Sequence, residues 1–300
     1  MKTYLECVPC FIRQTIDTAR LTTDDPAIHE KALREILTII SQMDFQRSPV
    51  VTGRSIQRLI QQLTGVHDPY KQLKQQFNRL VLDLYPMLEQ RVNAAANRFE
   101  TAARLALAGN MIDFGSGQTI SASDVVATIE TSLSAIICGD IKALQKAVGV
   151  ADSIIYLGDN CGEIVFDRLF IKQLSPRKVT YVVRAAPIIN DATMADAIAT
   201  GMTDIVKVMD SGSDAPGTVL AECSKSFKDA LKSADLVIAK GQGNYETLSE
   251  IDRPVFFMLK AKCPVVARHI GCAIGSYVIK KHANRSMPLT TSGVLSTRKS

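Results

Sequence analysis

The chain has 300 residues, of which 46% are hydrophobic, 22% are charged and 6% are aromatic, and it contains no tryptophan. Thirty-five Lys and Arg residues against 30 Asp and Glu residues give a net charge of +5. This composition excludes a disordered chain, a collagen-like repeat and a disulfide-rich miniprotein, and the length suits one large or two medium domains. No dense basic stripe or nucleic-acid-binding module is seen, so no nucleic-acid partner is expected.

Nothing in the sequence predicts export or membrane insertion. No apolar run approaches the roughly 20 residues that a membrane helix needs, and Glu6 and Arg13 interrupt any apolar core of a signal peptide. Seven scattered cysteines, an odd number, favour reduced thiols over a disulfide framework. We therefore expect a soluble cytoplasmic protein with no membrane partner, and leave its oligomeric state open.

The first half of the chain is predicted to be helical. Between Asp68 and Gly109, apolar residues recur every three or four positions, which places them on one face of a helix. Asp68 and Pro69 suit a helix cap and first turn, and Pro86 is expected to kink or divide the helix. No strand of comparable strength is seen before residue 150. Similar amphipathic stretches occupy 28–40, 55–63 and 123–137.

The second half changes to short β-branched runs that alternate with helical patterns. Such alternation is typical of βαβ units in a parallel sheet that is covered by helices on both faces. We therefore predict an α/β protein with an all-helical domain at 1–150 and a three-layer α/β/α Rossmann-like domain, with a mostly parallel sheet, at 151–300. The expected strands are 153–157, 179–183, 205–208, 236–239, 255–259 and 265–267, and the expected helices are 164–174, 193–199, 219–231 and 245–249.

Polar residues gather in the segments that directly follow the predicted strands. Ligands of open α/β sheets bind beyond the carboxyl ends of the strands, so a site is expected there. Asp159, Asn160 and Asp191 offer oxygen ligands that suit a hard divalent cation. Residues of these types also cap helices, so capping and metal binding both remain open at this point.

Basic groups and glycine-rich turns in the same segments suit a phosphate group. Arg184, Lys240 and Lys260 follow predicted strands and are candidates to meet an anion. Asn190, beside Asp191, is a further candidate substrate contact because of its position alone. A metal that bridges a phosphate ester is the chemistry that this combination favours.

Other patterns carry less information. The segment Gly241-Gln242-Gly243 lacks the third glycine of a dinucleotide fingerprint, and no Walker A sequence occurs. The four histidines show no zinc-type pairing, and His269 is interpreted as structural. The pair Cys7-x-x-Cys10 stands alone, so a structural helix entry is favoured over metal or redox use. Cys161 is interpreted as a packed thiol.

Three motifs occur in order along the chain: Gly158-Asp159-Asn160-Cys161-Gly162-Glu163, Asn190-Asp191, and Lys240-Gly241-Gln242-Gly243-Asn244-Tyr245-Glu246. With these motifs the chain resembles the damage-control phosphatase family, once called domain of unknown function eighty-nine. The pair Cys7-x-x-Cys10 and the segment Ala108-Gly109-Asn110-Met111-Ile112-Asp113 resemble its prokaryotic, cysteine-bearing branch. The resemblance spans nearly the whole chain.

The resemblance implies a metal-dependent phosphatase that acts on small phosphorylated metabolites, such as sugar phosphates or nucleotides. It implies a divalent cation (Mn²⁺, Mg²⁺, Co²⁺ or Ni²⁺) held by Asp159, Asn160 and Asp191. Eukaryotic members carry Arg at the position of Glu246, so their sugar-phosphate preference is not transferred to this chain. Asn110 is expected to reach the pocket from the helical side. Positions that match substrate contacts of the family are Glu163, Gln242, Gly243, Asn244, Tyr245 and Lys260.

Two chemical routes remain open for such an enzyme. Either a metal-activated water attacks the phosphorus, or Asp159 attacks it and forms an aspartyl-phosphate. In both, Lys260 and Lys240 are expected to stabilise the charge of the transition state. The alternative function is a nonenzymatic nucleotide- or metabolite-binding or redox-sensing module. A methyltransferase is disfavoured because Asp159 and Asn160 stand where a glycine-rich loop is expected.

Overall fold

The computed structural model describes residues 1–110 and 121–282; Met111, Ile112 and Asp113 of the motif above lie outside this part. Its amino-terminal part is helical, as predicted. The helices there are α1 (Cys7–Thr22), α2 (Pro26–Ser41), α3 (Pro49–Thr64), α4 (Lys71–Ala94), α5 (Arg98–Gly109) and α6 (Ala122–Ser134). None of the helices in the described residues has the length and apolarity required to cross a membrane.

A seven-stranded sheet in the order β1-β7-β6-β5-β2-β3-β4 follows in the chain. All neighbouring strands are parallel except β6 and β7, so the predicted mostly parallel α/β fold is confirmed. The strands are β1 (Ile137–Gly139), β2 (Ile154–Leu157), β3 (Val179–Val183), β4 (Lys207–Asp210), β5 (Leu236–Lys240), β6 (Val255–Lys260) and β7 (Tyr277–His282). The helices between them are α7 (Ile141–Val150), α8 (Glu163–Ile171), α9 (Met194–Ala199), α10 (Lys225–Ser233), α11 (Gly241–Leu248) and α12 (Pro264–Ile270).

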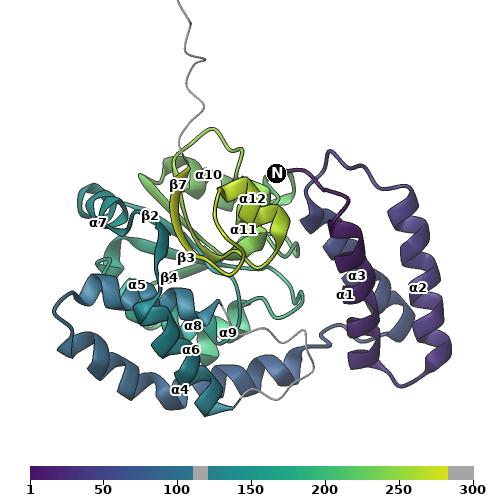
Figure 1. Ribbon diagram of the computed structural model, residues 1–300, viewed down its shortest axis with the longest axis horizontal. Coiled ribbons are helices and arrows are strands. Elements are labelled where there is room, and N and C mark those ends of the chain that lie inside the picture. The colour runs from purple at the N-terminus through teal and green to yellow at the C-terminus, as the bar shows by residue number, and fades with distance from the viewer. Residues whose placement is uncertain (111–120, 283–300) are drawn as a thin grey trace, which may run out of the picture.

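Helices cover both faces of the sheet (Figure 1). Side chains of a strand alternate between its faces, and β2 illustrates this. Ile154 and Tyr156 pack with α4, α5, α6 and α8, whereas Ile155 and Leu157 pack with α10, α11 and α12. Because both faces are buried, the central strands are apolar at nearly every position.

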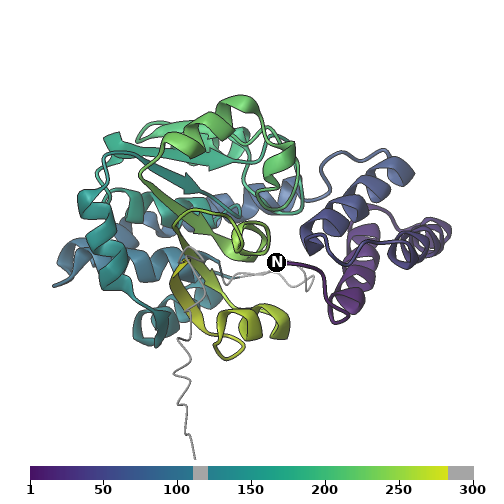
Figure 2. The same cartoon turned by 90° about the horizontal axis from the view of Figure 1, so that it is seen from above.

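Helices α1, α2 and α3 form a bundle beside the sheet (Figure 2). Phe11, Ile36 and Ile56 belong to its hydrophobic cluster, which is separate from the clusters of the sheet. Helices α4–α6, in contrast, share a cluster with the sheet. The hydrophobic clusters therefore separate between α3 and α4, and the domain boundary expected near residue 150 remains a prediction. Arg58 of α3 links the bundle to the sheet region by an ion pair with Asp214 at 2.9 Å.

The carboxyl-terminal elements differ from the prediction. Residues 265–267, predicted to be a strand, lie in α12, because Cys263 accepts a hydrogen bond from Val266 N and Pro264 occupies the first turn. His269 therefore lies on a helix and not after a strand. The last strand, β7, was not predicted, and it runs antiparallel to β6.

Three differences concern the rest of the chain. Strand β1 precedes residue 150, but it has only three residues and lies at the edge of the sheet. The helix predicted at 219–231 is interrupted, because Ser224 caps a separate helix by accepting a hydrogen bond from Phe227 N. Pro86 lies within α4 and does not divide it, whereas the kink expected there stays a prediction.

Candidate active site

The predicted site residues follow the carboxyl ends of β6, β5, β2 and β3, which are consecutive neighbours in the sheet. Strands β3 and β5 lie on opposite sides of β2, so the order in which the chain adds strands to the sheet reverses at β2. Such a reversal of strand order opens a crevice at the carboxyl edge, where ligands of this fold class bind. Asp159 and Asn160 directly follow β2 and therefore lie at this crevice.

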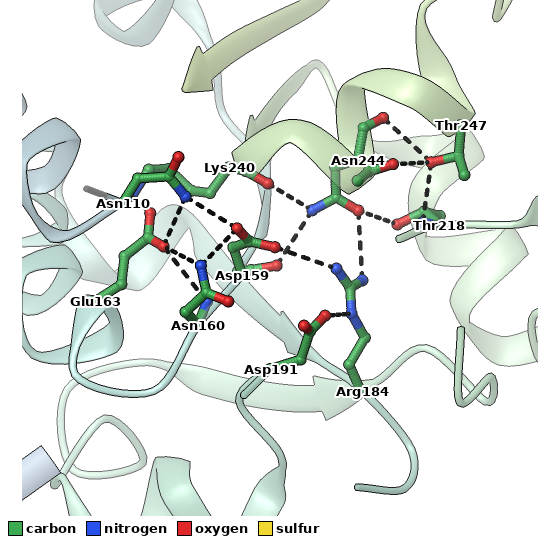
Figure 3. A network of polar contacts seen from close by, with 12 residues as sticks. Asn110, Asp159, Asn160, Glu163, Arg184, Asp191, Thr218, Lys240, Asn244 and Thr247 are labelled. Atoms are coloured by element: carbon green, nitrogen blue, oxygen red, sulfur yellow. Dashed lines mark hydrogen bonds and ion pairs between the residues drawn. The ribbon is translucent and has the colours of Figure 1, made fainter. Parts of the chain in front are cut away.

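Hydrogen bonds fix the orientation of Asp159 and Asn160 (Figure 3). Nδ2 of Asn160 donates to Oδ2 of Asp159 at 2.8 Å and to Oε2 of Glu163 at 3.1 Å. Nδ2 of Asn110, at the end of α5, donates to the same two oxygens at 2.9 Å each. Because both amides direct N–H groups at Oδ2 of Asp159, its Oδ1 and the Oδ1 of Asn160 remain for other partners. Asn110 thus reaches the site from the helical side, as expected.

Asp191 does not cap a helix. Thr193 is the cap residue of α9, and its backbone N–H donates to Asp196 at 2.9 Å. Oδ2 of Asp191 instead accepts a hydrogen bond from Nε of Arg184 at 2.6 Å. An isolated backbone bridge between Asn160 and Asp191 holds the two loops together. The structure therefore brings Asp159, Asn160 and Asp191 to one place, as the strand-end positions predicted.

The carboxylates of this site are crowded. Asp159 is 8% exposed and Asp191 is 4% exposed. Burial, and then the negative charge of Asp191, raise the pKa of Asp159 well above its usual value. Burial also raises the pKa of Asp191, although Arg184 opposes this. A cation beside the pair would relieve this repulsion.

One guanidinium nitrogen of Arg184 makes no hydrogen bond to the described residues. Its Nη1 donates to Oδ1 of Asn244 at 3.3 Å, and its Nε is used by Asp191. Nη2 is buried and has no hydrogen-bond partner within the described residues, and it lies 3.7 Å from Oδ1 of Asp159. Buried donors are nearly always paired, so an unpaired one beside a crevice points to a ligand oxygen.

The oxygen donors present suit a hard cation such as Mg²⁺ or Mn²⁺. Two carboxylates, of Asp159 and Asp191, and the amide oxygen of Asn160 make up the set. No cluster of three or more His, Cys, Asp or Glu side chains suited to a metal occurs in residues 1–110 and 121–282. A cation here would therefore have two acidic ligands and one amide ligand, and Mg²⁺ commonly completes such a set with water.

Lys240 and Glu163 were expected to contact substrate, but both side chains are fully buried. Nζ of Lys240 lies 2.6 Å from Oε1 of Glu163, 2.6 Å from Oδ1 of Asp167 and 3.0 Å from the carbonyl oxygen of Ala106. An ammonium group has three N–H donors, and these three acceptors use them all. Lys240 is therefore placed to support the site, and it has no free donor for a phosphate.

The turn that begins α11 supports Arg184 and Asp159. Nδ2 of Asn244 donates to the carbonyl oxygens of Lys240 at 2.8 Å and Gly158 at 3.2 Å, so its Oδ1 faces Arg184. Gly241 has a φ of 78°, and a Cβ at this position would lie 1.9 Å from Oδ2 of Asp159. Only glycine fits here, because both the backbone conformation and the space exclude a side chain.

Three further candidates at this edge of the sheet, Tyr245, Asn190 and Lys260, differ in burial and in hydrogen-bond partners. Tyr245 is buried, and its hydroxyl is 2.7 Å from Nδ1 of His269 on α12, so it is directed away from Asp159. Asn190 is half-buried, and its carbonyl oxygen accepts a hydrogen bond from Cys161 N. Lys260 is half-buried, and burial lowers the pKa of its ammonium group.

The last two candidates, Gln242 and Gly243, lie in the first turn of α11. Nε2 of Gln242 donates to Oε1 of Glu246 at 2.8 Å, while its Oε1 is buried with no hydrogen-bond partner in the described residues. Gly243 packs so tightly that an added Cβ would lie 2.0 Å from the carbonyl oxygen of Pro216. Cys161 is fully buried, and burial raises the pKa of its thiol, as a packed thiol requires.

Sequence reasoning missed three residues of this region. Asp167 lies one helical turn after Glu163, and this spacing of four residues is the signal that would have found it. Lys262 is exposed, and its positive charge acts on Asp159. Asn78 of α4 accepts a hydrogen bond from Gly162 N at 2.6 Å, but nothing distinguishes it from other polar residues of a long helix.

Comparisons with known proteins agree with this fold. Residues 3–278 match the family described as damage-control phosphatase ARMT1-like domain. A damage-control phosphatase of Pyrococcus horikoshii is 33% identical, with 94% of this chain and 99% of that protein covered. One from Archaeoglobus fulgidus is 32% identical over 91% of this chain and 97% of that protein. An uncharacterized protein of Methanocaldococcus jannaschii is 34% identical over 92% of this chain and 94% of that protein.

The same family is found among solved structures. The crystal structure of a Pyrococcus horikoshii protein of the domain of unknown function 89 family has a TM-score of 0.87 and 32% sequence identity to this chain. The alignment covers 94% of this chain and 100% of that chain. The range 3–278 that matches the family runs from the helical bundle through the sheet and contains the positions of the site residues. The chain belongs to the damage-control phosphatase family, whose named members are phosphatases.

Proposed function

We propose that this protein is a metal-dependent phosphatase that hydrolyses phosphate monoesters of small metabolites, such as sugar phosphates or nucleotides. Membership of the family supports phosphatase activity. The observation that carries the finer proposal is the meeting of Asp159, Asn160 and Asp191 beside Nη2 of Arg184, which makes no hydrogen bond to the described residues. Oxygen ligands for a cation and a buried donor for an anion are thus adjacent, which is the combination that a phosphate ester with its metal requires.

The proposed cation is Mn²⁺, Mg²⁺, Co²⁺ or Ni²⁺, held by Asp159, Asn160 and Asp191. When bound, it would supply neutralisation of phosphoryl charge and a water of lowered pKa. Arg184 would donate Nη2 to a phosphoryl oxygen, and its ion pair with Asp191 already holds the guanidinium in place. A donor that is oriented before the reaction stabilises the transition state without a cost of reorganisation. Lys260 and Lys262 would add positive charge at the rim of the site.

The attacking group is either a water molecule or Oδ1 of Asp159, the oxygen that is not held by the two amides. Acid quenching during turnover of a radiolabelled phosphate ester separates these routes. Label that remains on the denatured protein, and is lost in an Asp159→Ala variant, indicates an aspartyl-phosphate. Label found only in free phosphate and substrate indicates attack by water.

The proposal is tested by release of phosphate from an aryl phosphate after treatment with a chelator. We expect no turnover in the chelated protein and recovery with Mn²⁺, Mg²⁺, Co²⁺ or Ni²⁺. A panel of phosphorylated metabolites then identifies the substrate class. Full turnover after chelation would contradict metal dependence. Absence of phosphate release with every metal and every ester would instead favour the nonenzymatic binding module.

A further inference from the structure

A second charged group of side chains lies behind the candidate metal ligands, with no access to solvent. It comprises Glu163, Asp167 and Lys240, whose side chains are 0% exposed, and we refer to it as the buried Lys240 cluster. The hydroxyls of Tyr156 and Tyr181 donate to Asp167 at 2.7 and 2.9 Å. The residues come from α8, from the end of β5 and from the strands β2 and β3, so the cluster joins the elements that carry the site.

Stability does not account for such a cluster. Removal of three charged groups from water is costly, and well-packed apolar residues of similar volume stabilise a fold equally well or better. Buried ionic groups are instead suited to holding one conformation against others, since each of their bonds has a defined direction. A side-chain amide in contact with the cluster needs such a restraint, because it could otherwise turn over and exchange the places of its oxygen and nitrogen.

Asn160 is such a group. The oxygen and nitrogen of an asparagine amide are nearly identical in shape, so only hydrogen bonding decides which of them faces the crevice. Oε1 of Glu163 accepts from Lys240, and Oε2 accepts from Asn160 and Asn110. Nδ2 of Asn160 donates to Oε2 of Glu163 at 3.1 Å and to Oδ2 of Asp159 at 2.8 Å, so these two acceptors orient the amide and leave its Oδ1 on the opposite side (Figure 3).

We propose that Lys240 and Asp167 are positioning residues: they hold Glu163 so that its acceptor oxygen fixes the amide of Asn160 with Oδ1 toward the divalent cation. The inference rests on the proposed metal site. Asp167 holds Lys240 from the far side, Lys240 holds Glu163, and Glu163 orients Asn160. Lys240 thus acts on the metal ligand through two intervening hydrogen bonds and does not touch the substrate.

The decisive variant is Glu163→Gln, which keeps shape but replaces one acceptor by a donor. Lys240 requires an acceptor, so the new amide would direct Oε1 toward it and an N–H group toward Asn160. The amide of Asn160 would then face a donor at position 163 and an acceptor at Oδ2 of Asp159, so its two neighbours would no longer hold it in one orientation. We expect the affinity for Mn²⁺ to fall about 10- to 100-fold, as for loss of other groups that orient a metal ligand. The measurement is electron paramagnetic resonance of free Mn²⁺ during titration of the protein, without substrate.

The double variant Glu163→Gln with Lys240→Met distinguishes orientation from simple damage. Without the ammonium group, the amide at 163 is free to turn its oxygen toward Asn160. The double variant should therefore bind Mn²⁺ more tightly than the single variant, and within about threefold of the unchanged protein. Glu89→Gln is the matched control, because Glu89 forms a 2.6 Å ion pair with Lys172 at the surface and should leave Mn²⁺ affinity unchanged.

Thermal midpoints measured without metal establish that each variant is folded. Unchanged Mn²⁺ affinity in folded Glu163→Gln overturns the inference alone, and so does a folded double variant that binds no better than the single one. Failure of the unchanged protein to bind Mn²⁺ overturns the metal site and the inference together. If Glu163→Gln does not fold, Asp167→Asn takes its place, with an expected loss of about tenfold through a loosened Lys240. Unchanged affinity in that folded variant overturns the role of Asp167.

Discussion

Two groups of side chains in this protein each combine two carboxylates with one basic residue, yet they are paired differently. In the buried Lys240 cluster, the ammonium group has three acceptors and Asp167 has two tyrosine donors. In the strand-end cluster of Asp159, Arg184 and Asp191, Nη2 of Arg184 has no hydrogen-bond partner in the described residues. Complete pairing indicates a supporting role, and incomplete pairing indicates where a ligand belongs.

The pKa values of the buried groups also differ between the two clusters. Burial favours the neutral amine of Lys240, but Asp167 and Glu163 outweigh it and raise the pKa of Lys240. Burial raises the pKa of Asp167 to about 6, against the opposing effect of Lys240. In the strand-end cluster, burial and Asp191 raise the pKa of Asp159 well above its usual value despite Arg184. The positive charges of Arg184 and Lys262 therefore do not offset the burial of Asp159, and a divalent cation would supply further positive charge.

The largest effect is expected from Asp191→Asn, which removes one negative charge from the strand-end cluster. Metal affinity should fall about 10- to 100-fold, and turnover about 10²-fold or more, because a ligand and the position of the activated water are both affected. The thermal midpoint without metal should be retained, because Thr193 and not Asp191 caps α9 and the amide oxygen of the variant can still accept the hydrogen bond from Nε of Arg184. Calorimetric titration of Mn²⁺, phosphate release and thermal unfolding provide the three readouts.

Asp140→Asn is the matched control for this prediction. Asp140 is a true cap of α7, since its side chain accepts a hydrogen bond from Ala143 N at 2.9 Å. Asn caps helices about as well as Asp, so this variant should keep its stability and its activity. Near-unchanged turnover and metal affinity in Asp191→Asn would leave the proposed site without its third protein ligand.

Arg184→Lys is expected to have the next largest effect. Lysine keeps the charge but lacks the planar arrangement of donors that serves Asp191, Asn244 and a phosphoryl oxygen at once. We expect kcat/KM to fall about 10- to 100-fold, while Mn²⁺ affinity changes by no more than about threefold. Arg91→Lys is the control, because Arg91 pairs with Glu130 through two nitrogens at the surface. Equal kinetics of Arg184→Lys and unchanged protein would remove Arg184 from the phosphate site.

The location of the site could be predicted from the sequence, because parallel strands bring their carboxyl ends to one edge whatever the details of packing. That rule alone placed Asp159, Asn160 and Asp191 together. It did not place the side chain of Lys240, because a residue at a strand end can face either layer. The alternation of β5 decides this: Ile238 packs with α8, and Lys240, two residues later, faces the same way toward Glu163.

The elements that were predicted wrongly share a different physical cause. Short apolar runs are compatible with a strand or with a buried helix, and residues 265–267 belong to a helix seven residues long. Strand β1 has three residues, and its pairing with β7 is a tertiary contact without a local sequence signal. The orientation of Asn160 likewise depends on Asp159 and Glu163, and Glu163 is held by Lys240, about 80 positions from Asn160 in the chain.

The cysteine pair lies outside both clusters, so its replacement tests whether the activity needs residues beyond them. Cys7 and Cys10 occupy the first turn of α1, in the helical bundle. We expect the double variant Cys7→Ser with Cys10→Ser to keep turnover within about tenfold, because loss of one electrostatic element of a site typically costs ~10²–10³. Phosphate release by folded, metal-loaded protein is the measurement. Complete inactivation would show that the chemistry extends beyond the strand-end cluster.

Glu246 is a half-buried acid outside both clusters, and its Oε1 accepts a hydrogen bond from Nε2 of Gln242 at 2.8 Å. Burial raises the pKa of Glu246 to about 7. The folded state therefore holds this proton more tightly than the unfolded state. The resulting stability is fully present below the unfolded pKa of about 4.3, and it is lost as pH rises through about 7.

Glu246→Gln should remove this dependence, since a glutamine oxygen can still accept the hydrogen bond from Gln242. We expect the free energy of unfolding of the unchanged protein to fall, relative to the variant, by on the order of 1–2 kcal/mol between about pH 4.5 and 7, a value reduced for the partial exposure of the side chain. Urea unfolding of both proteins at several pH values gives the difference directly. A difference that is flat, or that favours the unchanged protein as pH rises, would mean that the folded state does not raise the pKa of Glu246.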